Sequence, residues 1–297
     1  MTEWPLITLV TPSFNQGRYL EATIRSVLAQ GYPRLEYIVV DGGSTDESVS
    51  IIDSYSDQLS WWVSERDTGQ TDAILKGFAK GNGVLMNWLN SDDLLRPDAL
   101  FAVARAHVAS GADLIVGGDR QFSTDPEQPV SFFRPAGYRF PDCLRFWTGA
   151  FRYHQPCTFF TRTLYDRAGG LDRSLHYVMD YDLYCRMLAS EGCQVHLVDD
   201  ELSAFRLHDA AKTSSAKAGF IRELREVSRR YWPGDWGAQE QAAMDDYAAE
   251  CSIFQAADAV RRRQWRQALL TMRLALHYAP LHALQFAGRR LMIGEKQ

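Results

Sequence analysis

Two adjacent carboxylates, Asp92 and Asp93, follow an apolar stretch at residues 84–89 and lie just before Pro97. This pattern is typical of a strand that presents acidic side chains at its C-terminal end. Adjacent carboxylates repel each other, and a hard cation such as Mg²⁺ or Mn²⁺ beside a phosphate would offset that repulsion. The pair therefore suggests a metal–phosphate site, although taken alone it favours an acidic turn before a helix that begins near Pro97.

Polar residues also follow other apolar runs of the chain. Thr11, Ser13 and Asn15 come at the end of the first run, and Asp41 comes at the end of the second. Because the C-terminal ends of parallel strands share one edge of an open sheet, these residues and the acidic pair can converge. Asp41, followed by two glycines, would suit a hydrogen bond to a nucleobase or ribose, whereas Asp-Gly-Gly-Ser alone favours a turn.

The elements that would position these groups alternate along the first 120 residues. Five short apolar runs are typical of strands: residues 6–11, 35–40, 59–63, 84–89 and 113–117. Helical patterns lie between them, at residues 20–28, 46–55, 71–80 and 97–110. This alternation predicts an α/β fold with a mainly parallel central sheet, helices on both faces and ligands at the C-terminal edge of the strands.

The alternation breaks beyond residue 121. Residues 122–155 are rich in Phe, Pro and Arg without clear periodicity, which predicts loops and a short antiparallel strand over one side of the site. Two later strands and a helix are expected at residues 156–161, 193–198 and 181–189. From about Phe220 the chain has an all-helical pattern.

Length and composition fit such a molecule. A chain of 297 residues with 46% apolar residues can bury a full core. We predict an α/β domain at 1–219, divided into halves 1–120 and 121–219, and a helical C-terminal extension at 220–297.

The five cysteines include no CxxC pair, which argues against a zinc site or a disulfide framework. Without a signal-peptide pattern or an apolar stretch of membrane-spanning length, we expect a cytoplasmic location.

The charge is unevenly distributed. The net charge is −5, yet residues 256–297 hold eight Lys or Arg against Asp258 and Glu295. This basic segment could contact an anionic surface, a membrane rather than a nucleic acid, which would place the protein peripherally on the inner face of the membrane. A solvated helix face explains Arg261–Arg263 slightly better, and the apolar stripe from Trp265 to Leu276 is interpreted as core packing.

Three segments together resemble family 2 of the glycosyltransferases with the GT-A fold, as found in bacteria. They are Thr-Leu-Val-Thr-Pro-Ser-Phe-Asn at 8–15, Tyr-Ile-Val-Val-Asp-Gly-Gly-Ser-Thr-Asp at 37–46 and Asn-Ser-Asp-Asp at 90–93. The resemblance spans about residues 5–210. It implies a Rossmann-like GT-A fold, a nucleotide-sugar donor, a divalent cation (Mn²⁺ or Mg²⁺) and inversion at the anomeric carbon by a single displacement. It also implies a hexosyl- or N-acetylhexosaminyltransferase of polysaccharide or cell-envelope biosynthesis, with a glycan or lipid-linked acceptor.

The resemblance assigns the donor half to residues 1–120 and roles to individual side chains. Asp41 would contact the base, which is expected to be uracil. Asp92 and Asp93 would hold ribose and metal, with Asp93 as the main metal ligand. Asn90 stands where many relatives have a further Asp. The other implied donor residues are Thr11, Pro12, Ser13, Asn15, Asp67, Lys76 and Arg206. For Asp67, capping of a surface helix is an equally good explanation.

The later part of the resemblance, residues 121–219, would form the acceptor half. His208 would complete the metal shell, and Arg206 or Lys212 would neutralise the leaving diphosphate. His154 and Gln155 lie where relatives shape the acceptor side.

A single displacement also needs a base on the acceptor hydroxyl. Asp180 aligns with the family's carboxylate at a helix start, where Met179 replaces a Glu. Asp182 is the alternative candidate for the base. Its presence is better explained as an acidic residue in the first turn of a helix, where negative charge is favourable.

Other classes of function were weighed on the same residues. A nucleotidyltransferase would need a glycine-rich basic loop after the first strand, where the chain has only Gly17 and Arg18. A dinucleotide-dependent oxidoreductase is disfavoured because no GxGxxG follows a strand. A nucleotide-sugar-binding protein without transfer activity remains an alternative. Only Met179 and Asn90, which depart from the family pattern, point to it.

Overall fold

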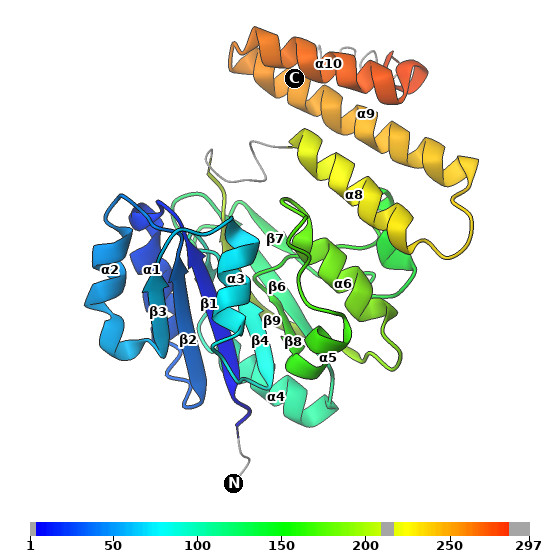
Figure 1. Ribbon diagram of the computed structural model, residues 1–297. Helices are drawn as coiled ribbons and strands as arrows, with labels where there is room; N and C mark the ends of the chain where they lie inside the picture. The colour runs from blue at the N-terminus through cyan, green and yellow to red at the C-terminus, as the bar shows by residue number, and fades with distance from the viewer. Residues whose placement is uncertain (1–3, 209–216, 285–297) are drawn as a thin grey trace. The chain divides into compact units, whose positions relative to one another are not determined.

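The computed structural model describes residues 4–208 and 217–284. The chain forms two compact units, one made of Met1–Cys143 with Ala150–Asp209, the other of Leu144–Gly149 with Ala210–Gln297. The first unit holds the sheet, and the second is helical (Figure 1). The functional division of the α/β part into a donor and an acceptor half stays a prediction.

The first unit is built on a single mixed sheet. Its strands are β1 (Ile7–Ser13), β2 (Leu35–Asp41), β3 (Trp61–Ser64), β4 (Leu85–Trp88), β5 (Leu94–Leu95), β6 (Leu114–Phe122), β7 (Ser131–Phe133), β8 (Thr158–Thr161) and β9 (Val195–Arg206). They follow the order β3-β2-β1-β4-β8-β6-β9-β5, with β7 beside β6. The pairs β2–β3, β1–β2, β1–β4 and β6–β9 are parallel. The antiparallel strand β8 lies between β4 and β6.

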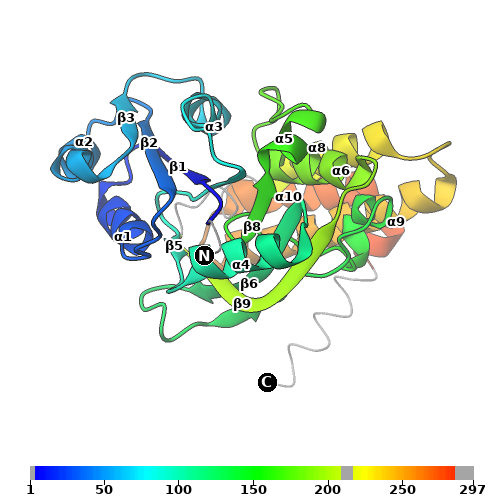
Figure 2. The same ribbon diagram turned by 90° about the horizontal axis from the view of Figure 1, so that it is seen from below.

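Helices cover both faces of this sheet, as Figure 2 shows. They are α1 (Gly17–Leu28), α2 (Ser48–Ser54), α3 (Gln70–Phe78), α4 (Ala99–Ser110), α5 (Arg162–Arg167) and α6 (Met179–Ala189). Successive residues of a strand point to opposite faces. Ile7 and Leu9 of β1 accordingly share a buried core with α1, α2 and α4, while Val10 faces α3. The predicted α/β class, with helices on both faces of a mainly parallel sheet and helices at the C-terminal end, is confirmed.

Two strands are longer than the sequence pattern indicated. The run expected at 113–117 continues to Phe122, and the one at 193–198 continues to Arg206. Asp199, Asp200 and Glu201 give the middle of β9 a charged character that masks a strand. The register of β6 against β9 shifts between Val116 and Asp119.

The second unit contains α8 (Lys217–Tyr231), α9 (Ala238–Arg261) and α10 (Trp265–Tyr278). Small and aliphatic side chains of α9 and α10, among them Ala249, Ile253 and Ala275, form its buried core. Trp147 packs against Trp232 and Trp236 in the same unit. Among the residues that the structure describes, no helix is both long and apolar enough to cross a membrane.

Close packing of α3 on β1 depends on a glycine. A Cβ atom on Gly77 would lie 2.4 Å from Cγ1 of Val10, which is far inside van der Waals contact. We expect Gly77→Val to lower the free energy of unfolding by about 1–3 kcal/mol through overpacking. Urea unfolding followed by circular dichroism would measure the change.

The control places the same side chain at the exposed end of the same helix. Ala79→Val should alter stability by no more than about 0.5 kcal/mol. Equal stabilities for the two variants would contradict the packing of α3 on β1.

Candidate functional site

The C-terminal ends of β1, β2 and β4 meet at one edge of the sheet, as the alternation predicted. Ser13 pairs with Asp41 in the register of β1 and β2, and the Leu89 N–H donates to the Val10 carbonyl. Asn15 links the first two loops, because its N–H donates to Ser44 Oγ at 2.7 Å and its Oδ1 accepts from the Thr45 N–H at 2.9 Å.

The predicted donor residues of β1 are buried at this edge. Thr11 Oγ1 lies 3.1 Å from the Tyr37 hydroxyl, and Pro12 is buried beside it. Ser13 is only 3% exposed, and its Oγ has no hydrogen-bond partner among the described residues. A buried hydroxyl without a partner is costly, which suits a group that binds a ligand at the strand end.

Asp41 organises its own loop. Its buried carboxylate accepts hydrogen bonds from the Gly43 and Ser44 N–H groups and from the Ser44 and Ser64 hydroxyls, at 2.5–3.1 Å. Both of its oxygens are thus engaged within the protein, so the turn indicated by Asp-Gly-Gly-Ser is present.

Asp67 lies against this loop. Its Oδ1 accepts from the Gly69 N–H at 2.9 Å, and a Cβ atom on Gly42 would lie 2.7 Å from its Oδ2. Glycine at position 42 therefore makes room for the carboxylate at the edge of the sheet. Asp67 is only partly buried, which leaves it able to contact a ligand there.

Lys76 belongs to an ion-pair network on α3. Its Nζ lies 3.0 Å from Glu65 and 3.4 Å from Asp72, and Arg173 lies 3.3 Å from the same Asp72 carboxylate. Hydrogen bonding to Glu65, with the charge of Asp72, raises the pKa of Lys76. These contacts engage the ammonium away from the acidic pair.

Asp93 is buried at the centre of the site. It is 1% exposed, its Oδ1 accepts from the Arg206 N–H at 3.0 Å, and its Oδ2 accepts from Asn90 Nδ2 at 3.4 Å. Burial, together with the charges of Asp92 and Asp119, raises the pKa of Asp93 well above its usual value. The Asn90 amide also accepts from Gln70 Nε2 at 2.7 Å, which ties α3 to the acidic pair.

Asp92 meets the end of β9, more than a hundred residues later in the chain. Its Oδ2 lies 2.9 Å from Nε2 of His208, and its carbonyl accepts from Arg206 Nε at 3.0 Å. The structure therefore brings Arg206 and His208 to the acidic pair. Lys212, the other candidate for neutralising the diphosphate, lies outside the described residues.

Aromatic rings fix the arginine. The Arg206 guanidinium lies 4.9 Å from the ring centroid of Tyr19 and 4.5 Å from that of Phe122, and the His208 ring lies 4.9 Å from the same Tyr19 ring. Each such cation–π contact contributes about 0.5–2 kcal/mol. Tyr19 follows the first strand without any motif that marked it, so sequence reasoning missed it.

The donor set suits a divalent cation in part. Carboxylate and imidazole ligands are compatible with Mn²⁺, and Asp92 Oδ2 and His208 Nε2 face each other. Asp93, the carboxylate expected to lead metal binding, accepts hydrogen bonds from Arg206 and Asn90, and its role as a metal ligand stays a prediction. Within residues 4–208 and 217–284, no three His, Cys, Asp or Glu side chains form a complete metal site. Such ions are commonly held by one or two protein ligands together with substrate phosphates and water.

His154, which was predicted to lie on the acceptor side, contacts a carboxylate that sequence reasoning missed. Its Nδ1 lies 3.1 Å from Asp119 Oδ2, and its ring stacks on Phe133 with centroids 4.1 Å apart. Asp119 is fully buried and accepts from Ser203 Oγ, and burial raises its pKa. The sequence signal that could have identified Asp119 is its position as a charged residue inside the apolar strand β6.

Gln155 is hydrogen-bonded to the end of β4, and its contact with an acceptor stays a prediction. Its Nε2 donates to Asn87 Oδ1 at 2.9 Å and to the Trp88 carbonyl at 2.6 Å. An acceptor contact through this amide nitrogen would have to replace those bonds.

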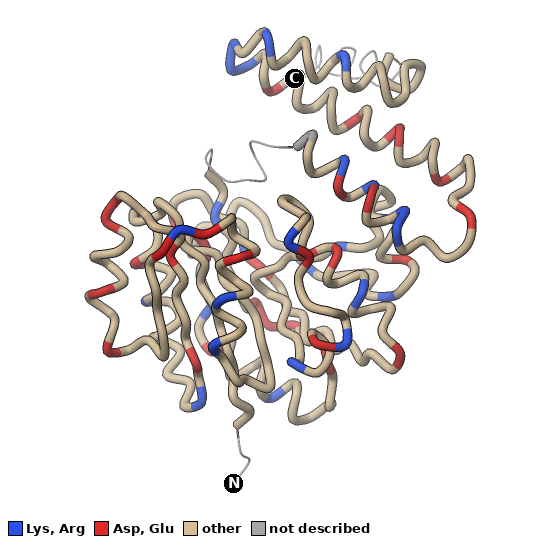
Figure 3. The backbone as a smooth tube through the Cα atoms, viewed as in Figure 1, with Lys and Arg blue, Asp and Glu red and all other residues tan. Residues whose placement is uncertain are grey.

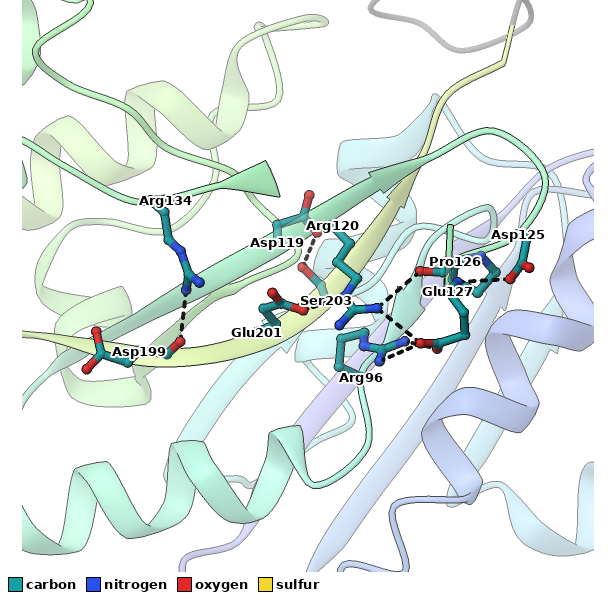
Figure 4. Close-up of polar contacts among 10 residues, drawn as sticks. All are labelled: Arg96, Asp119, Arg120, Asp125, Pro126, Glu127, Arg134, Asp199, Glu201 and Ser203. Carbon is teal, nitrogen blue, oxygen red and sulfur yellow. Dashed lines mark hydrogen bonds and ion pairs between the residues drawn. The ribbon is translucent and has the colours of Figure 1, made fainter. Parts of the chain in front are cut away.

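Arg120, the residue after Asp119, points to the other side of the sheet (Figure 4). There it pairs with Glu201 and Glu127, and Glu127 also pairs with Arg96. A cavity of about 390 Å³ adjoins these arginines and is lined further by the start of α4 and by Asp199–Glu201. None of the predicted site residues that the structure describes lines this cavity, so the network braces the strands and lies apart from the donor edge.

The two candidate bases on α6 have different surroundings. Asp182 is fully buried and forms an ion pair with Arg186. Asp180 is only partly buried, and its Oδ1 accepts from the Tyr181 N–H at 2.8 Å. Its charge adds to burial in raising the pKa of Tyr153 and Tyr184, so the carboxylate lies near the buried Tyr184 and the partly buried Tyr153.

A chain of contacts leads from α6 to the acidic pair. Met179, directly before Asp180, accepts a hydrogen bond from Thr71 of α3 at 2.6 Å. The neighbouring residue Gln70 contacts Asn90, which contacts Asp93. The start of α6 and the acidic pair are therefore both tied to the start of α3.

Comparisons with known proteins identify the family of the chain. The family model for glycosyl transferase family 2 matches residues 8–169, more than half of the chain. A glycosyltransferase of Mycobacterium tuberculosis, named as uncharacterised, is 29% identical over 78% of this chain and 87% of its own length. TuaG of Bacillus subtilis, described as a candidate teichuronic acid biosynthesis glycosyltransferase, is 36% identical over 34% of this chain and 41% of its own.

Solved structures share the fold at low sequence identity. S. aureus TarS 1–349 in complex with UDP-GlcNAc has a TM-score of 0.65 and 15% identity, covering 95% of this chain and 89% of that one. The mannosyltransferase PcManGT of Pyrobaculum calidifontis, in complex with GDP-Man and Mn²⁺, has a TM-score of 0.62 and 18% identity, covering 95% and 88%. With the family motifs at one sheet edge, the chain is a bacterial-type glycosyltransferase of family 2 with the GT-A fold.

Proposed function

We propose that this glycosyltransferase is a metal-dependent inverting enzyme that moves one sugar from a UDP-sugar to a hydroxyl group of a glycan or lipid-linked acceptor. The observation that carries the proposal is the meeting of Asp92 with Arg206 and His208 beside a buried second carboxylate. Asp92 and His208 can bind a cation, and Arg206 carries a fixed positive charge. A departing diphosphate is stabilised by positive charge from both sources.

The residues have distinct roles in the proposed reaction. Asp92 and His208 would hold a divalent cation, which supplies positive charge to the diphosphate. Arg206, which contacts the rings of Tyr19 and Phe122, would stabilise the leaving group. Ser13 and Asp67 would orient the nucleotide at the edge of the sheet, where the loop shaped by Asp41 lies.

Asp180 would act as the base. The acceptor oxygen forms a bond to the anomeric carbon while the bond from that carbon to the diphosphate oxygen breaks, and the acceptor proton passes to the Asp180 carboxylate. Asp180 suits this role better than Asp182, because the partner Arg186 already holds Asp182 as a buried anion.

Similar proteins support the proposed donor and the proposed cellular location of the reaction. The TarS complex contains UDP-GlcNAc and the PcManGT complex contains GDP-Man and Mn²⁺, which supports a nucleotide-sugar and a divalent cation here. The relative named for teichuronic acid biosynthesis supports an acceptor in a cell-envelope polysaccharide. We place the reaction on the cytoplasmic side of the membrane, where nucleotide-sugars are made.

A panel of nucleotide-sugars tests the donor. We expect UDP-sugars to raise the melting temperature in the presence of Mn²⁺, because a ligand that binds only the folded state stabilises it by about 2.7 kcal/mol at a hundredfold excess over Kd. Differential scanning fluorimetry with and without EDTA would measure this, with NAD as the control ligand. A panel in which no UDP-sugar stabilises the protein would contradict the proposed donor.

Asp92→Asn tests the metal ligand. The change keeps the shape of the side chain and removes its charge, so the Mn²⁺-dependent part of UDP affinity should fall at least about tenfold. Calorimetry with and without Mn²⁺ would measure it. Asp98→Asn, an exposed carboxylate six residues later, is the matched control and should bind UDP as the wild type does; equal affinities for both variants would rule out Asp92 as a ligand.

Asp180→Asn tests the base and separates an enzyme from a binding protein. Loss of a general base should lower kcat by about 10²–10⁴-fold while the Kd of the donor is unchanged. Asp182→Asn should instead lower the free energy of unfolding, by about 3 kcal/mol, because it leaves Arg186 without its partner. Steady-state kinetics and urea unfolding distinguish the two, and normal turnover by Asp180→Asn would refute the assignment.

A further inference from the structure

Helix α10 packs through small side chains and leaves its large ones outside. Ala268, Thr271 and Ala275 are its buried residues, and Ala275 belongs to the core shared with α9. The interpretation of the stripe from Trp265 to Leu276 as core packing is therefore corrected. Small residues let the two helices approach closely, so the bulky side chains of α10 are displaced to another face.

Those large apolar side chains form a continuous exposed stripe. Trp265, Leu269, Met272 and Leu276 are 65%, 57%, 36% and 40% exposed. Their spacing of four, three and four residues places them on one face of the helix. Single exposed apolar residues are ordinary, but a contiguous stripe of this kind marks an interaction surface.

Arginines border this stripe and acids are missing from it. Residues 259–294 contain seven Arg and no Asp or Glu. Arg266 and Arg273 are exposed and seven residues apart, so they lie along one side of the stripe. At the preceding turn, Arg261 and Arg262 both form ion pairs with Asp258. Figure 3 shows blue basic positions gathered at the turn between α9 and α10, with the red acidic positions on α9.

We propose that this face of α10 binds an anionic lipid surface, with the apolar stripe in the interface and Arg266 and Arg273 at the phosphate groups. A helix that is apolar on one face and arginine-bearing beside it suits the boundary between headgroups and acyl chains. Trp is favoured at that boundary because its ring is apolar and its N–H is polar. The inference extends beyond sugar transfer and does not depend on the donor or the base.

The charge of the face distinguishes a membrane from other occupants. In a symmetric dimer the same patch would meet itself, and the arginines of two copies would repel each other. Nucleic-acid surfaces generally present several aromatic rings for base stacking, whereas this stripe is mainly Leu and Met around one Trp. An anionic bilayer complements both the apolar stripe and the positive charge. Residues 285–297, also part of the basic segment, lie outside the described residues.

Vesicle co-sedimentation of the full chain tests the proposal. We expect binding to phosphatidylcholine vesicles containing about 30% phosphatidylglycerol, little binding to phosphatidylcholine alone, and weaker binding at high salt because surface charges are screened. The double variant Arg266→Glu/Leu269→Glu should lower the partition coefficient about tenfold or more, since it reverses one charge and removes one apolar contact. Circular dichroism would establish that it folds.

A matched control lies on α4 of the other unit. Arg105 and Val108 are exposed and have the same spacing, so Arg105→Glu/Val108→Glu should bind vesicles as the wild type does. The proposal is overturned if the wild type ignores anionic vesicles, or if the α10 variant binds them equally well. It is also overturned if sedimentation velocity without lipid shows a dimer that only the α10 variant loses.

Discussion

The burial of the Asp93 carboxylate beside two others is the constraint on which the site depends. Asp92 and Asp119 both raise its pKa, and water does not reach it to compensate. Carboxylates gathered in this way repel each other unless hydrogen-bond donors or cations lie close by. The protein provides the main-chain N–H of Arg206 and the Asn90 amide, and both depend on elements distant in sequence. The course of β9 and the position of α3 are therefore tied to one acidic residue.

Much of this arrangement could be predicted from the sequence. The alternation of apolar runs and helical patterns located β1–β4 and the helices between them, because each run stands alone between turn-forming residues. Since parallel strands share one C-terminal edge, the convergence of Asn15, Asp41 and the acidic pair followed. The roles of these residues rested on resemblance to the family and remain proposals.

Other features could not be predicted, and the reasons are physical. Periodicity shows that a segment is a strand but not which neighbour it pairs with, so the antiparallel insertion of β8 between β4 and β6 carried no signal. The charged residues in the middle of β9 hid the part of that strand from residue 199 to residue 206. Asp41 and Lys76 illustrate a further limit, because sequence identifies a charged group but not the partners that already engage it. Asp119 was overlooked because it sits inside a strand rather than at its end.

The contacts of strand β9 limit which segments of this enzyme could be exchanged with those of its relatives. Its parallel pairing with β6 is braced by the Glu201–Arg120 pair, and its last residues supply Arg206 to the acidic pair. The proposed nucleotide site is therefore not contained in the N-terminal 120 residues alone. A chimaera that exchanges the predicted acceptor half, residues 121–219, would also replace Arg206 and His208, two of the groups proposed to hold the donor and its cation.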